Sequence, residues 1–133
     1  MGLLIDTNIL IACERGKVDL EKMVVEHGDD LIFLSVISAS ELLHGVHRAI
    51  DEKIRMRRLA FVERVLYGMA ILDIDLSTAR IHSKLWSDFA SAGQMIGAHD
   101  LWLAASALAN NCVFVTRNVR EFERVPGLRL KIW

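Results

Sequence analysis

The chain has 133 residues, of which 53% are hydrophobic and 25% charged, and it contains a single proline. This length suits one domain, and this apolar share is far above that of disordered chains. The formal net charge of −1 excludes a protein that holds nucleic acid by bulk positive charge alone, because such domains are usually strongly basic. We therefore expect a single globular domain over residues 1–133.

Cysteine usage and the lengths of the apolar runs indicate where the chain works. Cys13 and Cys112 each lie in an apolar stretch, which is typical of reduced core thiols and not of a disulfide framework. The apolar start of the chain ends at Asp6, so it lacks the core of a signal peptide. The longest apolar run, residues 101–109, is too short to cross a bilayer. These features predict a soluble, cytoplasmic protein with no membrane partner.

The first half of the chain alternates between strand and helix patterns. A short apolar run predicts a buried strand at residues 2–5, and a helix follows over residues 7–14. The turn cluster at residues 27–30 separates a second helix from a second strand. In chain order, the remaining elements of this half are a helix at 19–26, a strand at 31–35, and helices at 36–49 and 51–67.

The second half continues the alternation. Ser77 is a suitable N-cap for a long helix, a glycine-bounded loop covers residues 93–97, and the Pro126-Gly127 pair suits a type II turn. The predicted elements, in chain order, are a strand at 69–72, helices at 77–92 and 100–110, a strand at 112–116, and an edge strand at 128–132.

Strands that alternate with helices predict an α/β fold, a three-layer α/β/α sandwich around a central parallel sheet of four or five strands. In such sheets the ligand site lies beyond the carboxyl ends of the strands. Asp6 directly follows the first predicted strand and Asn118 falls just after the fourth. Both residues should therefore lie at this edge of the sheet.

Two further acids stand on helices that are otherwise apolar. Glu41 shares a narrow polar stripe with Ser38 and Gly45, and Asp100 begins an apolar helix. Because a buried lone carboxylate is costly, such acids are usually paired or bind a metal. The alternatives are that Asp6 caps the first helix, that Asp100 complements a helix dipole, and that Glu41 is exposed. Their common position around one edge favours a shared site.

Basic residues cluster in two segments of the charge-balanced chain. Residues 53–64 contain five basic residues against Glu63, and residues 117–131 contain five against Glu121 and Glu123. The first segment has apolar residues at helical spacing and could simply be a solvated helix face. For the second segment we favour contact with phosphate.

A resemblance to a known family rests on four stretches of the chain: LLIDTNIL, SASELLHG, IGAHDLWLAASAL and TRNVREFERVPGLRLKIW. Their order and spacing resemble those of PIN-domain ribonucleases over essentially the whole chain, and the most similar group is the VapC toxin type. The resemblance implies that Asp6, Glu41 and Asp100 are metal-site and catalytic acids. Asn118 matches a position where the family carries Asp or Asn, so it is expected to support catalysis by hydrogen bonding and not by direct ligation.

The resemblance also implies an activity, a cofactor and partners. The activity is that of a divalent-metal-dependent endoribonuclease, the toxin of a toxin–antitoxin pair, which uses Mg²⁺ or Mn²⁺ to activate water and leaves 5′-phosphate and 3′-hydroxyl ends. Carboxylate and water oxygens are the ligands that these ions prefer. The implied partners are an RNA substrate, a VapB-like antitoxin that covers the site, and a second copy of the chain. Both a homodimer and a toxin–antitoxin hetero-oligomer are therefore expected.

Thr116 and Ser38 resemble residues that hold the acids in place, with a purely structural role as the alternative. Arg117 and Arg120, in the second basic segment, should contact the substrate. His99 is a candidate substrate contact, with packing or surface exposure as the favoured alternative. Candidate interface anchors are three tryptophans, of which Trp102 also suits the core: Trp86, Trp102 and Trp133.

Two rival functions come from other classes. A phosphatase with an aspartyl nucleophile would also place Asp6 after the first strand, but Asn8 stands where its second Asp is required. A non-catalytic PIN-like module that binds RNA or protein is the second alternative. The presence of Asp6, Glu41 and Asp100 weighs against this alternative. Cation-dependent RNA cleavage would distinguish a ribonuclease from such a binding module.

Overall fold

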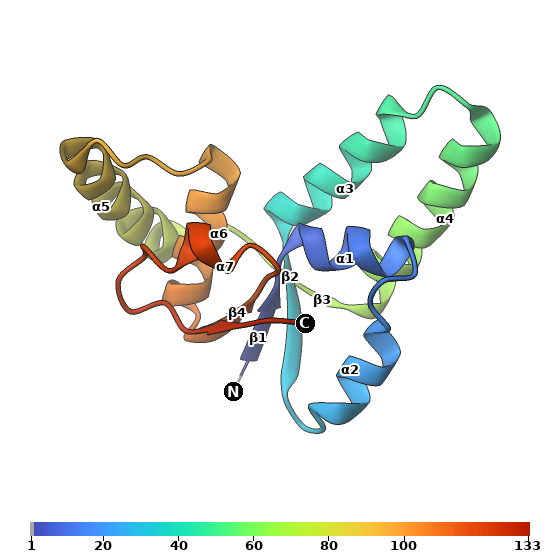
Figure 1. Cartoon of the computed structure of the whole chain (residues 1–133), viewed down its shortest axis with the longest axis horizontal. Helices are drawn as coiled ribbons and strands as arrows, with labels where there is room; N and C mark the ends of the chain where they lie inside the picture. Colours follow the sequence, from blue (N-terminus) through green and yellow to red (C-terminus); the bar gives the residue numbers. More distant parts are fainter. Residues whose placement is uncertain (1) are drawn as a thin grey trace.

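The computed structural model describes residues 2–133 and confirms the predicted α/β/α architecture. A sheet of five parallel strands, in the order β3-β2-β1-β4-β5, lies between two groups of helices (Figure 1). The strands are β1 (Gly2–Ile5), β2 (Leu31–Ser35), β3 (Ala70–Leu72), β4 (Cys112–Val115) and β5 (Leu130–Lys131).

Seven helices within the described residues cover the two faces of this sheet. One group contains α1 (Thr7–Glu14), α2 (Leu20–Glu26), α3 (Val36–Arg48) and α4 (Glu52–Gly68). The other group contains α5 (Leu76–Ala92), α6 (Ala98–Ala109) and α7 (Val119–Phe122). Figure 1 shows α3 and α4 side by side in a hairpin that projects from the body of the molecule.

Alternation along the strands divides the core between the two faces, because successive side chains of a strand point to opposite sides. Leu3 and Ile5 pack with α1 to α4, whereas Leu4 packs with α5 to α7. Phe114 on β4 lies in register with Leu4 and joins the same cluster. The central strand β1 is thereby buried on both faces, and its end is fixed at Asp6.

The structure corrects several predicted boundaries. Ser77 is not the cap of α5, because Asp75 accepts hydrogen bonds from the backbone N and Oγ1 of Thr78, and the helix begins at Leu76. Helix α6 begins at Ala98, so Asp100 lies in its first turn and does not start it. The short helix α7 was not predicted, because four residues give too little periodicity to recognise.

The C-terminal segment agrees with its prediction in topology but is shorter. Strand β5 spans only Leu130–Lys131 and lies at the edge of the sheet beside β4. The turn before it is closed by a hydrogen bond from Leu128 N to Val125 O, and Gly127 has a φ of 78°, which suits the predicted type II turn. Within residues 2–133, no helix combines the length and apolarity that a bilayer crossing requires.

Candidate active site

Asp6 occupies the junction between β1 and α1, at the carboxyl edge of the sheet. It stands at the N-cap position of α1, but its side chain makes no capping hydrogen bond. Instead, Thr116 Oγ1 donates a hydrogen bond of 2.7 Å to Asp6 Oδ2, from the loop that follows β4. Only 5% of Asp6 is exposed. The capping alternative therefore does not explain this carboxylate.

The three predicted acids lie close enough to affect one another electrostatically, although they come from distant segments of the chain. Burial raises the pKa of Asp6 to about 6, and repulsion by Asp100 and Glu41 acts in the same direction, against the Thr116 hydrogen bond. Burial also raises the pKa of Glu41, with Asp100 adding to the effect and His99 opposing it. The folded chain thus concentrates negative charge at one edge of the sheet.

Asp100 lies in the first turn of α6, and it belongs to this group as well. Burial raises its pKa, followed by repulsion from Glu121, while His99 opposes the increase. The helix behind it has fully buried small residues, Ala104 and Ala107 among them, so α6 lies tight against the sheet. Asp100 can interact with the helix dipole from this position, but its charge also raises the pKa of both Asp6 and Glu41.

Glu41 is half-buried on α3, with 29% of its side chain exposed. Its Oε1 is buried and has no hydrogen-bond partner among the described residues. His99 Nδ1 lies 3.5 Å from that oxygen, which makes it an electrostatic neighbour and not a well-formed hydrogen-bond donor. Glu41 therefore offers an unused hydrogen-bond acceptor at the site. A buried carboxylate oxygen without a donor is costly, which favours a ligand that would bind it.

Thr116 links several parts of the site through its single hydroxyl. Besides donating to Asp6, its Oγ1 accepts from the backbone N of Asn118 at 2.9 Å and from Asn8 Nδ2 at 3.4 Å. Asn8 Oδ1 in turn accepts from the backbone N of Arg117 at 3.3 Å. This network connects the start of α1 to the loop after β4.

The other predicted residues lie around the acids in different environments. Ser38 is fully buried and accepts a hydrogen bond of 2.9 Å from Thr7 Oγ1. Asn118 joins the network only through its backbone, and its exposed side chain makes no capping hydrogen bond with α7. Arg117 and Arg120 are exposed beside it and make no side-chain hydrogen bond or ion pair with the described residues.

Two contributors were missed by the sequence reasoning. Asn8 was considered only as a mismatch to the phosphatase pattern, although its place two residues after Asp6 puts it on the first turn of α1. Glu121, on the unpredicted helix α7, acts on the charge of Asp100 while it pairs with Arg124 at 3.2 Å. An acid in such a short helix gives no signal in the sequence that would place it near the site.

The acids suit a divalent cation by their chemistry. No group of three or more His, Cys, Asp and Glu side chains in residues 2–133 is already arranged with metal-site spacing. The donor set nevertheless consists of hard carboxylate oxygens, one of which, Glu41 Oε1, is buried without a partner. Burial is the main cause of the raised pKa values of Asp6, Glu41 and Asp100, and a bound cation would offset both that burial and the repulsion between the acids.

Comparison with known proteins gives a consistent family. The sequence model described as the PIN domain matches residues 3–128. Ribonuclease VapC1 of Rickettsia felis is 37% identical over 130 residues, which cover 98% of this chain and 95% of that protein. The tRNA(fMet)-specific endonuclease VapC of Salmonella typhimurium is 29% identical over 133 residues, which cover 100% of this chain and 98% of that protein.

Solved structures agree with these sequence relatives. DNA-bound VapBC from Salmonella typhimurium superposes with a TM-score of 0.90 at 28% identity, covering 100% of this chain and 98% of the other. VapBC2 from Rickettsia felis, bound to a promoter DNA fragment, gives a TM-score of 0.87 at 27% identity, with 100% and 99% coverage. The chain therefore belongs to the PIN-domain family and, within it, to the VapC ribonucleases.

Proposed function

We propose that the chain acts as a single PIN domain that cleaves RNA internally with the help of Mg²⁺ or Mn²⁺, held by Asp6, Glu41 and Asp100. The observation that carries this proposal is the gathering of three mutually repelling carboxylates at the carboxyl edge of the sheet, one of them with an unpartnered oxygen. Burying carboxylates that repel one another costs free energy of folding, and a bound cation offsets that cost.

The protein's own residues would orient both the cation ligands and the RNA. Thr116 fixes one oxygen of Asp6, and Asn8 and the Asn118 backbone hold Thr116. The exposed side chains of Arg117 and Arg120 would bind phosphate, as guanidinium groups do with two parallel hydrogen bonds. A bound divalent cation would supply Lewis-acid activation of water and of the scissile phosphate.

Three further residues have narrower proposed roles. Asn118 would direct its exposed amide toward RNA or a bound water. His99, beside Glu41 and 60% exposed at its side chain, would contact the substrate. Ser38, which is fully buried and bonded to Thr7, would hold α1 and α3 in the relative position that brings Asp6 to Glu41.

The decisive experiment is single-turnover cleavage of transfer RNA during titration with Mg²⁺ and Mn²⁺. Transfer RNA is the first substrate to test, because a relative is described as specific for tRNA(fMet). Asp6→Asn keeps nearly the same shape and removes a charge, so cleavage should fall about a hundredfold or more, equivalent to about 2.7 kcal/mol. Asp75→Asn, which alters a helix cap on α5, should cleave normally. Equal cleavage by Asp6→Asn at limiting cation would contradict the metal assignment.

One observation favours the non-catalytic alternative. Within residues 2–133, no three acids, histidines or cysteines are arranged with the spacing of a metal site. The same titration separates the two functions. A catalytic PIN domain should give new RNA ends that depend on both the cation and Asp6. A binding module should retain RNA without producing such ends, and Asp6→Asn should then bind RNA no more weakly.

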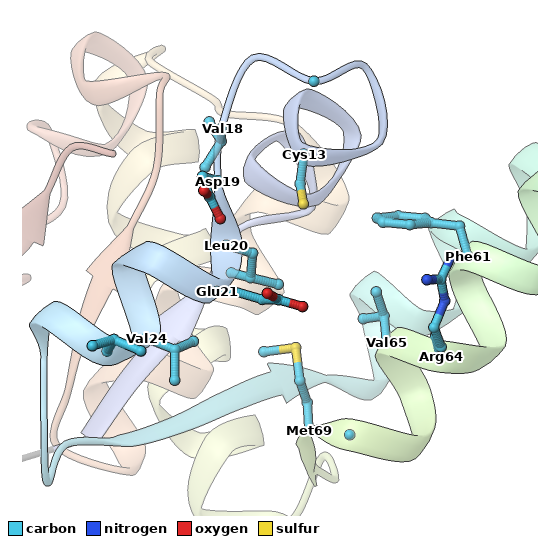
Figure 2. A pocket seen from close by; sticks show the side chains of 13 residues that line it. Cys13, Val18, Asp19, Leu20, Glu21, Val24, Phe61, Arg64, Val65 and Met69 are labelled. Atoms are coloured by element: carbon cyan, nitrogen blue, oxygen red, sulfur yellow. The ribbon is translucent and has the colours of Figure 1, made fainter.

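The proposed partner is a VapB-like antitoxin, because the neighbours described above were solved as VapBC complexes. The proposed place of action is the cytoplasm. A groove of about 910 Å³ between α1, α2 and α4 offers an apolar surface that suits an amphipathic partner helix (Figure 2). Its lining includes Val18, Leu20, Val24, Phe61, Val65 and Met69. An arginine from such a partner could then reach the acids and exclude the cation.

Homodimers and toxin–antitoxin hetero-oligomers are part of the same proposal. Trp86 on α5 is 55% exposed and is available as an interface anchor, whereas Trp102 stacks on His82 at 3.5 Å between ring centroids and serves the packing of α5 against α6. Trp133 is half-buried beside His27. Expression of the chain alone should arrest growth, and co-expression with the antitoxin should restore it and yield a copurified small protein.

A further inference from the structure

A second, smaller cavity lies between the end of α1 and the outer side of α4, away from the acids. Its volume is about 360 Å³. Six residues line it, namely Glu14, Ile54, Arg57, Arg58, Phe61 and Arg64; we call it the arginine cavity. Arginine and aromatic side chains alternate along one stripe of α4, because positions 57, 61 and 64 are three or four residues apart.

The charges of the arginine cavity are only partly compensated. Arg58 is fixed, since its Nε bonds to Glu14 Oε1 at 3.2 Å and its Nη1 bonds to the carbonyl of Gly45 at 3.0 Å. Arg57 and Arg64 make no hydrogen bond or ion pair with any described residue. One carboxylate thus faces three guanidinium groups. The cavity keeps a net positive charge and two free bidentate donors.

The position of the cavity relative to the acids follows from α1. Asp6 directly precedes this helix and Glu14 is its last residue. With a rise of about 1.5 Å per residue, the arginine cavity lies roughly 12 Å along α1 from the acids. Ile11 and Arg15, which are exposed, share the stripe of Asn8 along this path. An RNA chain that leaves the acids along α1 would reach the cavity.

We propose that the arginine cavity binds the phosphate backbone of the RNA substrate outside the cleaved bond, an inference that rests on the proposed ribonuclease function. Arg57 and Arg64 bind phosphate oxygens, and Arg58 keeps the cavity in shape through Glu14 and Gly45. Phe61, whose ring extends from α4 toward Cys13 of α1 in Figure 2, also lines this cavity and supplies an apolar surface for a ribose or base. Two uncompensated guanidinium groups next to an aromatic ring favour a nucleic acid over a protein here.

Binding without cleavage tests this assignment directly. The probe is bulk transfer RNA in buffer with a chelator, so that no cation-dependent cleavage interferes. The double variant Arg57→Ala with Arg64→Ala should bind about tenfold more weakly, and the slope of log affinity against log salt should flatten by about 1.4, at roughly 0.7 per phosphate contact. The matched control is Arg55→Ala with Arg80→Ala, which removes two unpaired arginines outside the cavity and should bind nearly as wild type.

Cleavage with two substrate lengths provides the second test. With transfer RNA, the double variant should raise KM about tenfold and leave kcat unchanged. With a dinucleotide, whose only phosphodiester is the cleaved one, its KM and kcat should both match the wild type. An equal effect on both substrates, or an equal effect of the control pair, would overturn the inference.

The outcomes also separate this inference from the proposed function. If the wild type cleaves no RNA with any cation, the ribonuclease function fails, and the binding assay alone decides whether the cavity takes RNA. If the wild type cleaves but the double variant binds and cleaves transfer RNA normally, the cavity is not an RNA site. A double variant with normal RNA binding overturns the inference whether or not it still copurifies with a co-expressed antitoxin, because Arg64 also lines the groove proposed for that partner.

Discussion

Asp6, directly after β1, and Phe114, on the neighbouring strand β4, are both buried, yet their surroundings differ in kind. Phe114 lies in the apolar core, in register with Leu4 and 4.6 Å from the ring of Phe122 between centroids. Asp6 lies at the carboxyl edge, where burial and like charges raise its pKa to about 6. The core contains groups that stabilise one another, whereas the edge contains groups that repel. This difference indicates that the edge is arranged for binding at a cost in stability.

The largest effect should come from breaking the core side of this comparison. Phe114→Ala should destabilise the fold by about 3–5 kcal/mol, because it leaves a cavity in a fully buried region. Urea unfolding measures this loss. Tyr67→Ala is the matched control, since Tyr67 is 97% exposed, and it should change stability by no more than about 0.5 kcal/mol. Similar losses for both would show that the core is not packed as described.

At the carboxyl edge of the sheet, a substitution should instead stabilise the fold, and the size of this effect should depend on pH. Because the pKa of Asp6 rises to about 6 on folding, the folded chain keeps a proton that the unfolded chain releases. The stability of the cation-free wild type should therefore fall as pH rises from about 4 to 6 and then level off. The loss from Asp6 amounts to roughly 3 kcal/mol. Asp6→Asn should lack it, so the variant should be more stable than the wild type at neutral pH.

Asp75 provides a control of opposite sign for the pH series. Hydrogen bonds from the backbone and then the side chain of Thr78 lower its pKa. The wild type should therefore be more stable than Asp75→Asn at neutral pH, and this advantage should shrink as the pH falls through the acid range. Urea unfolding with chelator at several pH values compares the two variants. A stability difference for Asp6→Asn that does not grow with pH would contradict the raised pKa.

Thr116 shares a property with each region. It is fully buried, as the core residues are, and its hydroxyl donates a hydrogen bond to Asp6 at the edge of the sheet. Thr116→Val removes the donor to Asp6 and the acceptor for the backbone N of Asn118, so cleavage should fall about 10- to 100-fold, as for other residues that orient metal ligands. Thr116→Ser keeps the hydroxyl and should retain most of the activity. If Val and Ser variants cleave equally well in single-turnover assays, the hydroxyl does not position Asp6.

The smallest effect should come from the exposed rim beyond the edge. Arg117→Ala or Arg120→Ala should weaken RNA binding a few-fold and flatten its salt slope by about 0.7, because each removes about one phosphate contact. Cation affinity, measured by titration, should stay unchanged. Arg80→Ala on α5 removes an exposed charge far from α7 in sequence and should leave RNA binding intact. A drop in cation affinity for Arg117→Ala or Arg120→Ala would mean that these substitutions disturb the acids.

Periodicity predicted the succession of strands and helices better than it predicted the contacts at the carboxyl edge of the sheet. The alternation of strands and helices correctly indicated the parallel sheet, because apolar spacing records which side of an element is buried. It could not place the caps, since Asp75 and Ser77 are both good N-cap residues and tertiary packing decides between them. The network through Asn8 and the repulsion from Glu121 depend on contacts between distant segments, which no local pattern contains.

The hydrogen bond from Thr116 to Asp6 joins residues that are 110 positions apart, and this has a consequence for synthesis. Strand β4, which places Thr116, pairs directly with β1, so the site lacks this support until the chain has been made past residue 116. Chains are made from the N-terminus at about 5–20 residues per second. A partly made chain therefore carries all three acids but not the arrangement that joins them. The acids of the growing chain therefore stay without this support until β4 has been made and has paired with β1.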